Sequence, residues 1–359
     1  MDYITRNFSL TNSTKDKLKD YFLKTYEIYE KLFEILKDDT VFYEQPEKLR
    51  HPIIFYFGHT ATFYINKLNI AGISDIRLDE QMERIMAIGV DEMSWDDLNQ
   101  THYKWPSIAS VREYRQKAKE FVLEIIDTLE YKTPISWDSP LWIILMGIEH
   151  ERIHLETSSV LIRQLDIKFV KQSKIFLPCL NFGNAPKNEL VKFNSCDIVM
   201  GKGLDDGEYY GWDNEYGTKK AKVAEFETSK FLVSNNEFLE FVKSGGYQKE
   251  EFWESEGLSW LLYAKPSLPT FWIKMDSGYK LRLIDREIDL PLNFPVEVNY
   301  HEAKAFCNYK SQVDGIKYRL PTEEEWYAIY EAEGVKDEKE WGEKAPANIN
   351  LEYFASPTP

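Results

Sequence analysis

The chain has 359 residues, about twice the usual length of one domain, so we expect two domains with separate cores. Its 44 basic and 60 acidic residues give a net charge of -16 at pH 7, which argues against nucleic acids and anionic membrane surfaces as partners. We expect a cytoplasmic protein, because no apolar run reaches the roughly 20 residues of a membrane span, the first residues lack a secretory signal pattern, and the three cysteines show no CxxC spacing.

Four amphipathic helices are predicted in the first half, where apolar residues recur every three or four positions. They span residues 18–37, 53–68, 107–129 and 140–165. Thr11, Asn12 and Ser13 form a capping cluster before the first helix, and Ser139 followed by Pro140 marks the start of the fourth. An irregular acidic stretch separates the second helix from the third. Four long helices with polar connections predict an up-and-down bundle over residues 1–170.

The second half follows a different pattern. Residues 171–190 are expected to form a linker, and residues 191–359 a second domain. Gly, Pro and Asn separate short segments rich in Phe, Val and Tyr, and helical patterns are brief, at residues 235–243 and 301–310. This pattern predicts a mixed α+β domain.

Two of the six histidines, His150 and His154, lie four residues apart on the fourth predicted helix. This spacing places both imidazoles on one face, one turn apart, where a helix can offer two nitrogens to one metal ion. The alternative is that the two histidines are ordinary surface or core residues that bind no metal. Charged neighbours such as Glu149 and Arg152 on a helix that faces the bundle favour the metal, or an ion pair.

The same segment also forms an HExxH sequence, which raises the alternative of a zinc metallopeptidase with Glu151 as its general base. The Gly and third His of the metzincin continuation do not follow. Glu156 points away from the face that carries the two histidines, so a hydrogen bond or salt bridge beside the metal suits it better than direct ligation.

His59 is the expected third ligand. It lies among aromatic residues in the middle of the second predicted helix, beside Gly58, where another group can approach the backbone closely. A single histidine in such a place is more often a hydrogen-bonded core residue, but the pair on the fourth helix favours a ligand. His51 and His102 are expected to cap a helix or lie at the surface. Three neutral imidazoles suit a divalent metal of borderline softness.

These segments carry a family resemblance. The first half resembles 5-histidylcysteine sulfoxide synthases, the enzymes that open ovothiol biosynthesis. The similar segments are residues 51–68, 89–97, 105–107 with Val111, Tyr114 and Arg115, and 147–159. The resemblance implies a DinB-like four-helix bundle in which three histidines hold a non-haem iron(II).

The second half resembles the formylglycine-generating enzyme, or sulfatase-modifying factor, domain, which has a C-type-lectin-like fold. The similar segments are residues 210–217, 233–238, 245–247, 295–307 and 318–326. Cys307 falls in the amphipathic helix of this pattern and is expected to pack in the core. Family members continue past the last segment, so the resemblance implies an incomplete domain that leaves Trp326, Trp341 and Phe354 exposed. We therefore expect this chain to bind iron but to turn over substrates poorly.

The resemblance implies an Fe(II)-dependent enzyme that uses O2 to join the sulfur of cysteine to the imidazole C5 of histidine as a sulfoxide. Metal ligation would present the cysteine sulfur as a thiolate. Arg112 and Arg115 on the third predicted helix are candidates to bind a substrate carboxylate. The equally weighted alternative is that both are solvated arginines on the face of the helix. A catalytically inactive binding module is the non-enzymatic alternative. The sequence does not identify the residue that donates a proton in catalysis.

Overall fold

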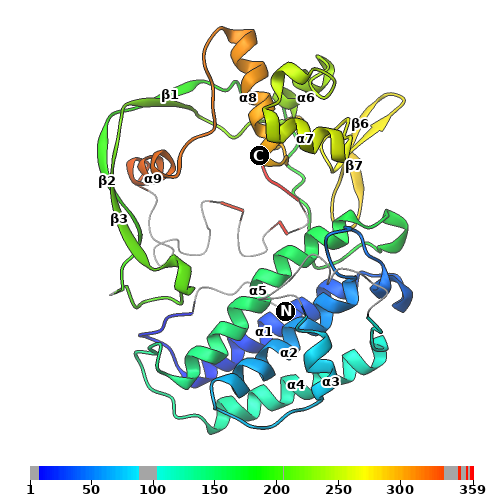
Figure 1. Cartoon of the computed structure of the whole chain (residues 1–359), viewed down its shortest axis with the longest axis vertical. Helices are drawn as coiled ribbons and strands as arrows, with labels where there is room; N and C mark the ends of the chain where they lie inside the picture. Colours follow the sequence, from blue (N-terminus) through cyan, green and yellow to red (C-terminus); the bar gives the residue numbers. More distant parts are fainter. Residues whose placement is uncertain (1–7, 89–102, 205, 335–346, 349–352, 355) are drawn as a thin grey trace. The chain divides into compact units, whose positions relative to one another are not determined.

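The structure, a computed structural model, describes residues 8–88, 103–204, 206–334, 347–348, 353–354 and 356–359 (Figure 1). The chain divides into two compact units. The first unit consists of Met1–Lys174 and Leu204–Trp212, and the second of Ile175–Gly203 and Asp213–Pro359. A border was expected at residue 170, and the first segment of the first unit ends at Lys174. Residues 204–212 were expected in the second domain but belong to the first unit.

The first unit is built on helices. Its elements are α1 (Lys15–Phe33), η1 (Asp39–Tyr43), α2 (Ile53–Ile70), α3 (Glu80–Ile85), α4 (Ile108–Thr128), α5 (Pro140–Gln164) and η4 (Ile167–Phe169). Helices α1 and α2 each pack against both α4 and α5, and the four long helices lie side by side in Figure 1. The predicted four-helix bundle is therefore confirmed.

Capping side chains set where these helices begin. The side chain of Thr14 accepts a hydrogen bond from the Lys17 amide, so α1 starts at Lys15, after the predicted capping cluster. Helix α1 also ends at Phe33, earlier than predicted. The Ser139 hydroxyl accepts from the Leu141 amide at the start of α5, as predicted.

Helix α3 was not predicted. It occupies part of the acidic stretch between the second and third predicted helices, and Asp79 caps it by accepting a hydrogen bond from the Met82 amide at 3.0 Å. With only six residues it is too short to be stable alone. Tertiary contacts must therefore hold it in place.

A buried arginine lies at the centre of the bundle. The Arg115 side chain is fully buried, and its guanidinium carbon lies 4.3 Å from the ring centre of Tyr26, 5.3 Å from Tyr29 and 4.7 Å from Phe57. These distances fit cation–π contacts. Aromatic rings from α1 and α2 thus surround a cation donated by α4.

The second unit combines short strands and helices, as predicted for residues 191–359. Its elements are β1 (Leu190–Phe193), β2 (Cys196–Lys202), η5 (Asp213–Glu215), β3 (Gly217–Val223), β4 (Phe226–Ser229), α6 (Asn235–Lys243), η6 (Glu250–Phe252), α7 (Ser255–Ala264), β5 (Trp272–Met275), β6 (Gly278–Arg282), β7 (Glu287–Asp289), α8 (Tyr300–Asp314) and α9 (Glu323–Ala332). Antiparallel pairing in the described residues gives the sheets β1–β4, β2–β3 and β5–β6–β7.

The main core of the second unit is aromatic. Phe238 and Phe241 of α6 pack with Phe306 of α8 and Trp272 of β5. A smaller cluster joins Ile198 and Met200 of β2 to Val223 of β3 and Ala328 of α9. The unit therefore has apolar cores of its own, separate from that of the bundle.

Trp326 is 54% exposed, as expected, whereas Phe354 is half-buried and its ring centre lies 5.0 Å from that of Phe176. Trp341 lies outside the described residues. Cys307 is half-buried on α8, and the three cysteines are free thiols.

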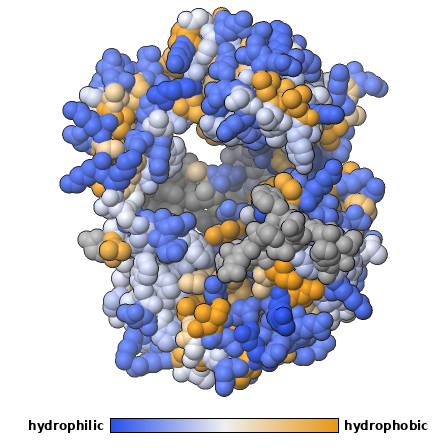
Figure 2. Space-filling model, in the orientation of Figure 1, coloured by the Kyte–Doolittle hydropathy of each residue, from blue (hydrophilic) through white to orange (hydrophobic). Residues whose placement is uncertain are grey.

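The surface is mixed in character. Figure 2 shows hydrophobic residues as separate orange groups among hydrophilic blue ones on the face that it draws. Exposed apolar residues distributed among polar ones are normal on protein surfaces. Among the described residues, no helix is both long enough and apolar enough to cross a membrane.

Candidate metal centre

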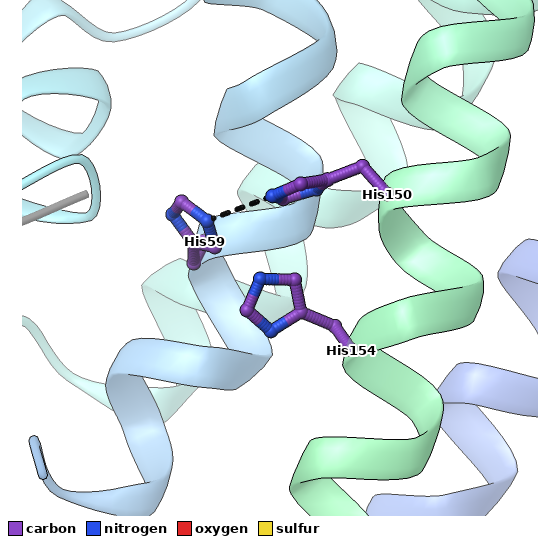
Figure 3. A group of neighbouring side chains, drawn as sticks. All are labelled: His59, His150 and His154. Carbon is purple, nitrogen blue, oxygen red and sulfur yellow. Dashed lines mark hydrogen bonds between the residues drawn. The ribbon is translucent and has the colours of Figure 1, made fainter. Parts of the chain in front are cut away.

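Helices α2 and α5 bring three histidines together. His59 comes from α2, and His150 and His154 come from successive turns of α5. Figure 3 shows the three imidazoles pointing toward one another between the two helices. One potential ligand nitrogen from each lies within 4.8 Å of the others, and Nε2 of His59 is 3.2 Å from Nε2 of His150. The structure thus groups the three histidines that the sequence analysis singled out as ligands.

A backbone carbonyl orients His59. Its Nδ1 lies 2.7 Å from the carbonyl oxygen of Met86. A carbonyl only accepts hydrogen bonds, so Nδ1 carries a proton, and in the neutral imidazole Nε2 then presents a lone pair. The side chain is 2% exposed. This is the arrangement in which a histidine holds a metal through one nitrogen and is oriented through the other.

The two histidines of α5 are kept neutral. Burial, and after it the neighbouring imidazoles of His154 and His59, hold the pKa of His150 well below its usual value. Burial followed by the nearby His59 lowers the pKa of His154 to about 3. Neutral imidazoles keep the lone pairs that a metal needs at physiological pH.

Aromatic side chains of α2 enclose the cluster. The ring of Phe63 stacks on His150, with ring centres 3.6 Å apart, and Phe55 stacks on His59 at 5.1 Å. The ring centre of Tyr56 lies 6.2 Å from that of His154. No role was predicted for these residues from the sequence. Phe63 follows His59 by four positions, so helical spacing could have placed it on the same face.

This donor set fits a divalent metal ion such as iron(II). Among the described residues, no hydrogen-bond partner meets the buried Nδ1 atoms of His150 and His154. Buried polar atoms without partners are costly, and three neutral imidazoles that face one another form a set of lone pairs that a cation would satisfy. A metal ion is thus consistent with the chemistry of the cluster.

Glu151 does not point into this cluster. Its carboxylate is fully buried and lies 3.1 Å from Nη2 of Arg115, while the hydroxyls of Thr60 and Tyr64 donate to it at 3.0 and 3.2 Å. Burial raises the pKa of this carboxyl, opposed by Arg115. The HExxH alternative required Glu151 as a general base beside the metal, so the structure argues against the metallopeptidase.

The predicted substrate role of Arg115 is wrong in this structure. Its Nη1 donates to the Phe57 carbonyl at 2.7 Å and to the Thr60 hydroxyl at 2.9 Å. With no exposed surface and these partners inside the bundle, the guanidinium cannot reach a substrate carboxylate. Arg112 is exposed and binds Asp39 through both terminal nitrogens, at 3.0 and 2.6 Å, which matches the alternative of a solvated helix-face arginine.

The remaining candidates lie as follows. Glu156 is exposed on α5, so its position does not suggest a link to the three ligands. His51 is buried, which corrects the expected surface role, and its ring packs against Phe55 and Trp105. His102 lies outside the described residues, as does the motif at residues 89–97.

Both halves of the chain match known domains. Residues 21–158 match the DinB superfamily, and residues 184–355 match the sulfatase-modifying factor enzyme 1-like domain. All three histidines of the cluster fall within the first match. The fold class predicted from the sequence, a DinB-like bundle followed by a sulfatase-modifying factor domain, is confirmed.

Three relatives illustrate the similarity. Hercynine oxygenase of Mycolicibacterium thermoresistibile is 26% identical over 313 residues, which are 86% of this chain and 66% of the relative. Ergothioneine biosynthesis protein 1 of Neurospora crassa is 23% identical over 333 residues, 83% of this chain and 36% of the relative. Inactive C-alpha-formylglycine-generating enzyme 2 of Mus musculus is 28% identical over 169 residues, 42% of this chain and 49% of the relative. The chain thus spans less than two thirds of the length of these relatives.

Proposed function

We propose that this chain is an iron(II)- and O2-dependent sulfoxide synthase. It belongs, with hercynine oxygenase and ergothioneine biosynthesis protein 1, to the family that joins a DinB-superfamily domain to a sulfatase-modifying factor enzyme 1-like domain. The cluster of His59, His150 and His154 is the observation that carries the proposal. It supplies three neutral nitrogen ligands and leaves further coordination positions for substrates. We place the activity in the cytoplasm, where the free cysteines would stay reduced.

The residues of the bundle would hold the metal and shield it. His59, His150 and His154 would bind iron, and Phe55 and Phe63 would limit the access of water to it. Bound iron would supply the activation of O2 and the ligation of a substrate thiolate. The protein's own contribution is the fixed orientation of the ligands and the placing of two substrates next to each other.

The proposed substrates are cysteine and histidine, and the proposed product carries the cysteine sulfur on the imidazole C5, the first step of ovothiol biosynthesis. Residues 51–68 and 147–159 resemble segments of 5-histidylcysteine sulfoxide synthases, and this resemblance supports histidine as the imidazole substrate. The reaction balances with one O2. The new carbon–sulfur bond replaces an S–H and a C–H bond, one oxygen atom enters the sulfoxide, and the other leaves as water.

Hercynine, the trimethylated betaine of histidine, is the second candidate for the imidazole substrate. The name of one relative, hercynine oxygenase, favours it. A larger thiol such as γ-glutamylcysteine is the corresponding second candidate for the sulfur donor. Competition between paired substrates separates these possibilities, because each combination gives a product of different mass.

The test is oxygen uptake by the chain after anaerobic loading with Fe(II). We expect O2 consumption that requires both a thiol and an imidazole substrate, with a sulfoxide product identified by mass. Cysteine with histidine should give a higher rate of O2 consumption than pairs that contain hercynine or a larger thiol. The variant His150→Ala should show background uptake only. If the iron-loaded chain consumes no O2 with any substrate pair, or oxidises the thiol to a disulfide without forming a carbon–sulfur bond, the proposal is wrong.

A further inference from the structure

We propose that Glu83 is a positioning residue for the metal centre, because it holds the short helix α3 whose end presents the Met86 carbonyl to His59. This inference rests on the proposed function only in taking His59 as a metal ligand. Glu83 itself touches none of the three histidines. It acts through the backbone that follows α3.

The link begins at His59. The Met86 carbonyl accepts the Nδ1 proton of His59 at 2.7 Å, and Met86 is the residue that ends α3. Its amide bonds back to the Met82 carbonyl at 3.0 Å, so the position of this carbonyl depends on the last turn of α3. If α3 moved, the proton of His59 would lose its acceptor and the imidazole would be free to exchange tautomers.

Glu83 is the main anchor of α3. Its carboxylate is 1% exposed and accepts hydrogen bonds from the amides of Leu78 and Asp79, at 2.9 and 3.2 Å. Arg77 donates to its other oxygen at 3.0 Å. These bonds close the loop before α3 onto the helix itself. A buried carboxylate persists only with such partners, and here they fix the start of the helix.

Neighbouring helices complete the support. The hydroxyl of Tyr114 on α4 donates to the Glu83 carboxylate at 3.2 Å, and burial followed by the nearby Glu83 raises the pKa of Tyr114, so the hydroxyl keeps its proton. On α2, the Asn66 amide donates to the Glu83 carbonyl at 3.2 Å. Helix α3 is thus tied through Glu83 to the helix that carries His59.

Gly58 provides a second, independent contact. A Cβ atom at this position would lie 2.8 Å from Sδ of Met86 and 2.9 Å from its Cγ. The Met86 side chain can therefore pack against α2 only because residue 58 lacks a side chain. This places Met86 directly beside the turn of α2 that presents His59.

The decisive experiment compares Glu83→Gln with Glu302→Gln in the full chain. Glu302 is an equally buried carboxylate in the second unit, and it accepts hydrogen bonds from the Tyr247 hydroxyl and the Asn299 amide. The variant Glu302→Gln therefore measures the general effect on the chain of losing a buried carboxylate. The first readout is Co(II) affinity, measured by competition with a chelator. We expect Glu83→Gln to bind Co(II) about ten times more weakly than the wild type, and Glu302→Gln to bind it as the wild type does.

The second readout is the tautomer of His59 in the metal-free chain labelled with 15N-histidine, with the His59 signals assigned from their loss in His59→Gln. We expect a single Nδ1-protonated form in the wild type and in Glu302→Gln, and averaged tautomers in Glu83→Gln. The wild-type tautomer together with unchanged Co(II) affinity in Glu83→Gln would overturn the inference. So would an equal loss of affinity in Glu302→Gln.

The variants Gly58→Ala and Gly58→Ala/Met86→Ala decide the question if Glu83→Gln does not fold. The added methyl group should displace Met86 and lower Co(II) affinity several-fold, and removal of the Met86 side chain should restore it while the backbone carbonyl remains. Unchanged affinity in Gly58→Ala, or a double variant as weak as the single one, would count against the inference. A wild type that binds no Co(II) would instead contradict the metal site of the proposed function.

Discussion

The imidazoles of His150 and His154 are neutral in the folded chain, and this has a consequence for stability. Burial, followed by the neighbouring imidazoles, lowers the pKa of both, for His154 from 6.5 to about 3. In the unfolded chain both would gain protons near pH 6.5. The stability that depends on their neutral form is therefore complete above about pH 6.5 and lost progressively as the pH falls toward about 3.

We predict that the metal-free chain loses stability on acidification from about pH 7 to about pH 5.5, by up to about 1.4 kcal/mol per pH unit for each of these histidines. The variant His154→Gln should lose less than the wild type over this interval. Urea unfolding at the two pH values measures the difference. Equal losses in the two proteins would show that His154 takes up its proton as readily in the folded chain as in the unfolded chain.

A second prediction at this scale concerns Glu151. The variant Glu151→Gln removes the buried carboxylate next to Arg115 and leaves this cation only the longer ion pair with Glu30, at 3.4 Å. Removing one partner of a buried pair costs about 3 kcal/mol. We expect urea unfolding to show a loss of this order. A variant that keeps its stability but loses a zinc-dependent peptidase activity would instead revive Glu151 as a general base.

Residue types and spacing predicted which three histidines come together, but not the side chains around them. The four-residue separation of His150 and His154 predicted that both lie on one face, and the aromatic setting of His59 suggested a buried position. The partner of Arg115 could not be predicted in the same way. Arg115 and Glu151 lie on different helices, and only the packing of α4 against α5 brings them together.

At the scale of elements, the crossing of α2 and α5 decides the geometry of the metal centre, and Gly147 allows it. A Cβ atom on Gly147 would lie 2.2 Å from Cε1 of Tyr64. We predict that Gly147→Ala destabilises the chain by about 1 to 3 kcal/mol, because the Tyr64 ring has to move. It should also weaken Co(II) binding, because the two helices carry all three ligands.

The control for this prediction is Gly207→Ala, since a Cβ at Gly207 would meet no atom within 4 Å. It should match the wild type in urea unfolding and in Co(II) affinity. If Gly147→Ala is as stable as the control, or more stable through the higher helix propensity of alanine, the close contact between α2 and α5 does not limit the packing.

Long helices could be predicted from sequence, and short ones could not. The apolar repeat of Phe22, Tyr26 and Tyr29 covers several turns, so α1 was evident from its periodicity. Helix α3 has only six residues, and the carboxylate that holds it in place, Glu83, looks in the sequence like any other surface acid. Tyr114 of α4 donates to this carboxylate, and Asn66 of α2 donates to the backbone carbonyl of Glu83. No local sequence pattern encodes these contacts.

At the scale of the whole molecule, each unit has its own apolar core, so a metal ion bound in the bundle should stabilise only the first unit. We predict that Co(II) at about 100 times its dissociation constant raises one calorimetric transition by about 5 to 10 °C, which corresponds to roughly 2.7 kcal/mol. A second transition should not move. A uniform shift of all the heat absorption, or no shift, would contradict this assignment.

The division of the chain was only partly predictable. The change in composition after residue 170 suggested a border there, and the first segment of the first unit extends to Lys174. No local sequence pattern predicts that residues 204–212 belong to the first unit, because this depends on their pairing with a segment far away in the sequence. The Leu10 amide bonds to the Glu208 carbonyl at 2.8 Å, and Ser9 pairs with Tyr209.

The central claim is that His59, His150 and His154 bind one metal ion, and metal stoichiometry in single histidine variants tests it most directly. We predict about one Fe(II) per wild-type chain after anaerobic loading, and far less in His59→Ala, His150→Ala and His154→Ala. His51→Ala, which removes another buried histidine of the first unit, should retain the metal. Full iron in His59→Ala together with its loss in His51→Ala would contradict the account.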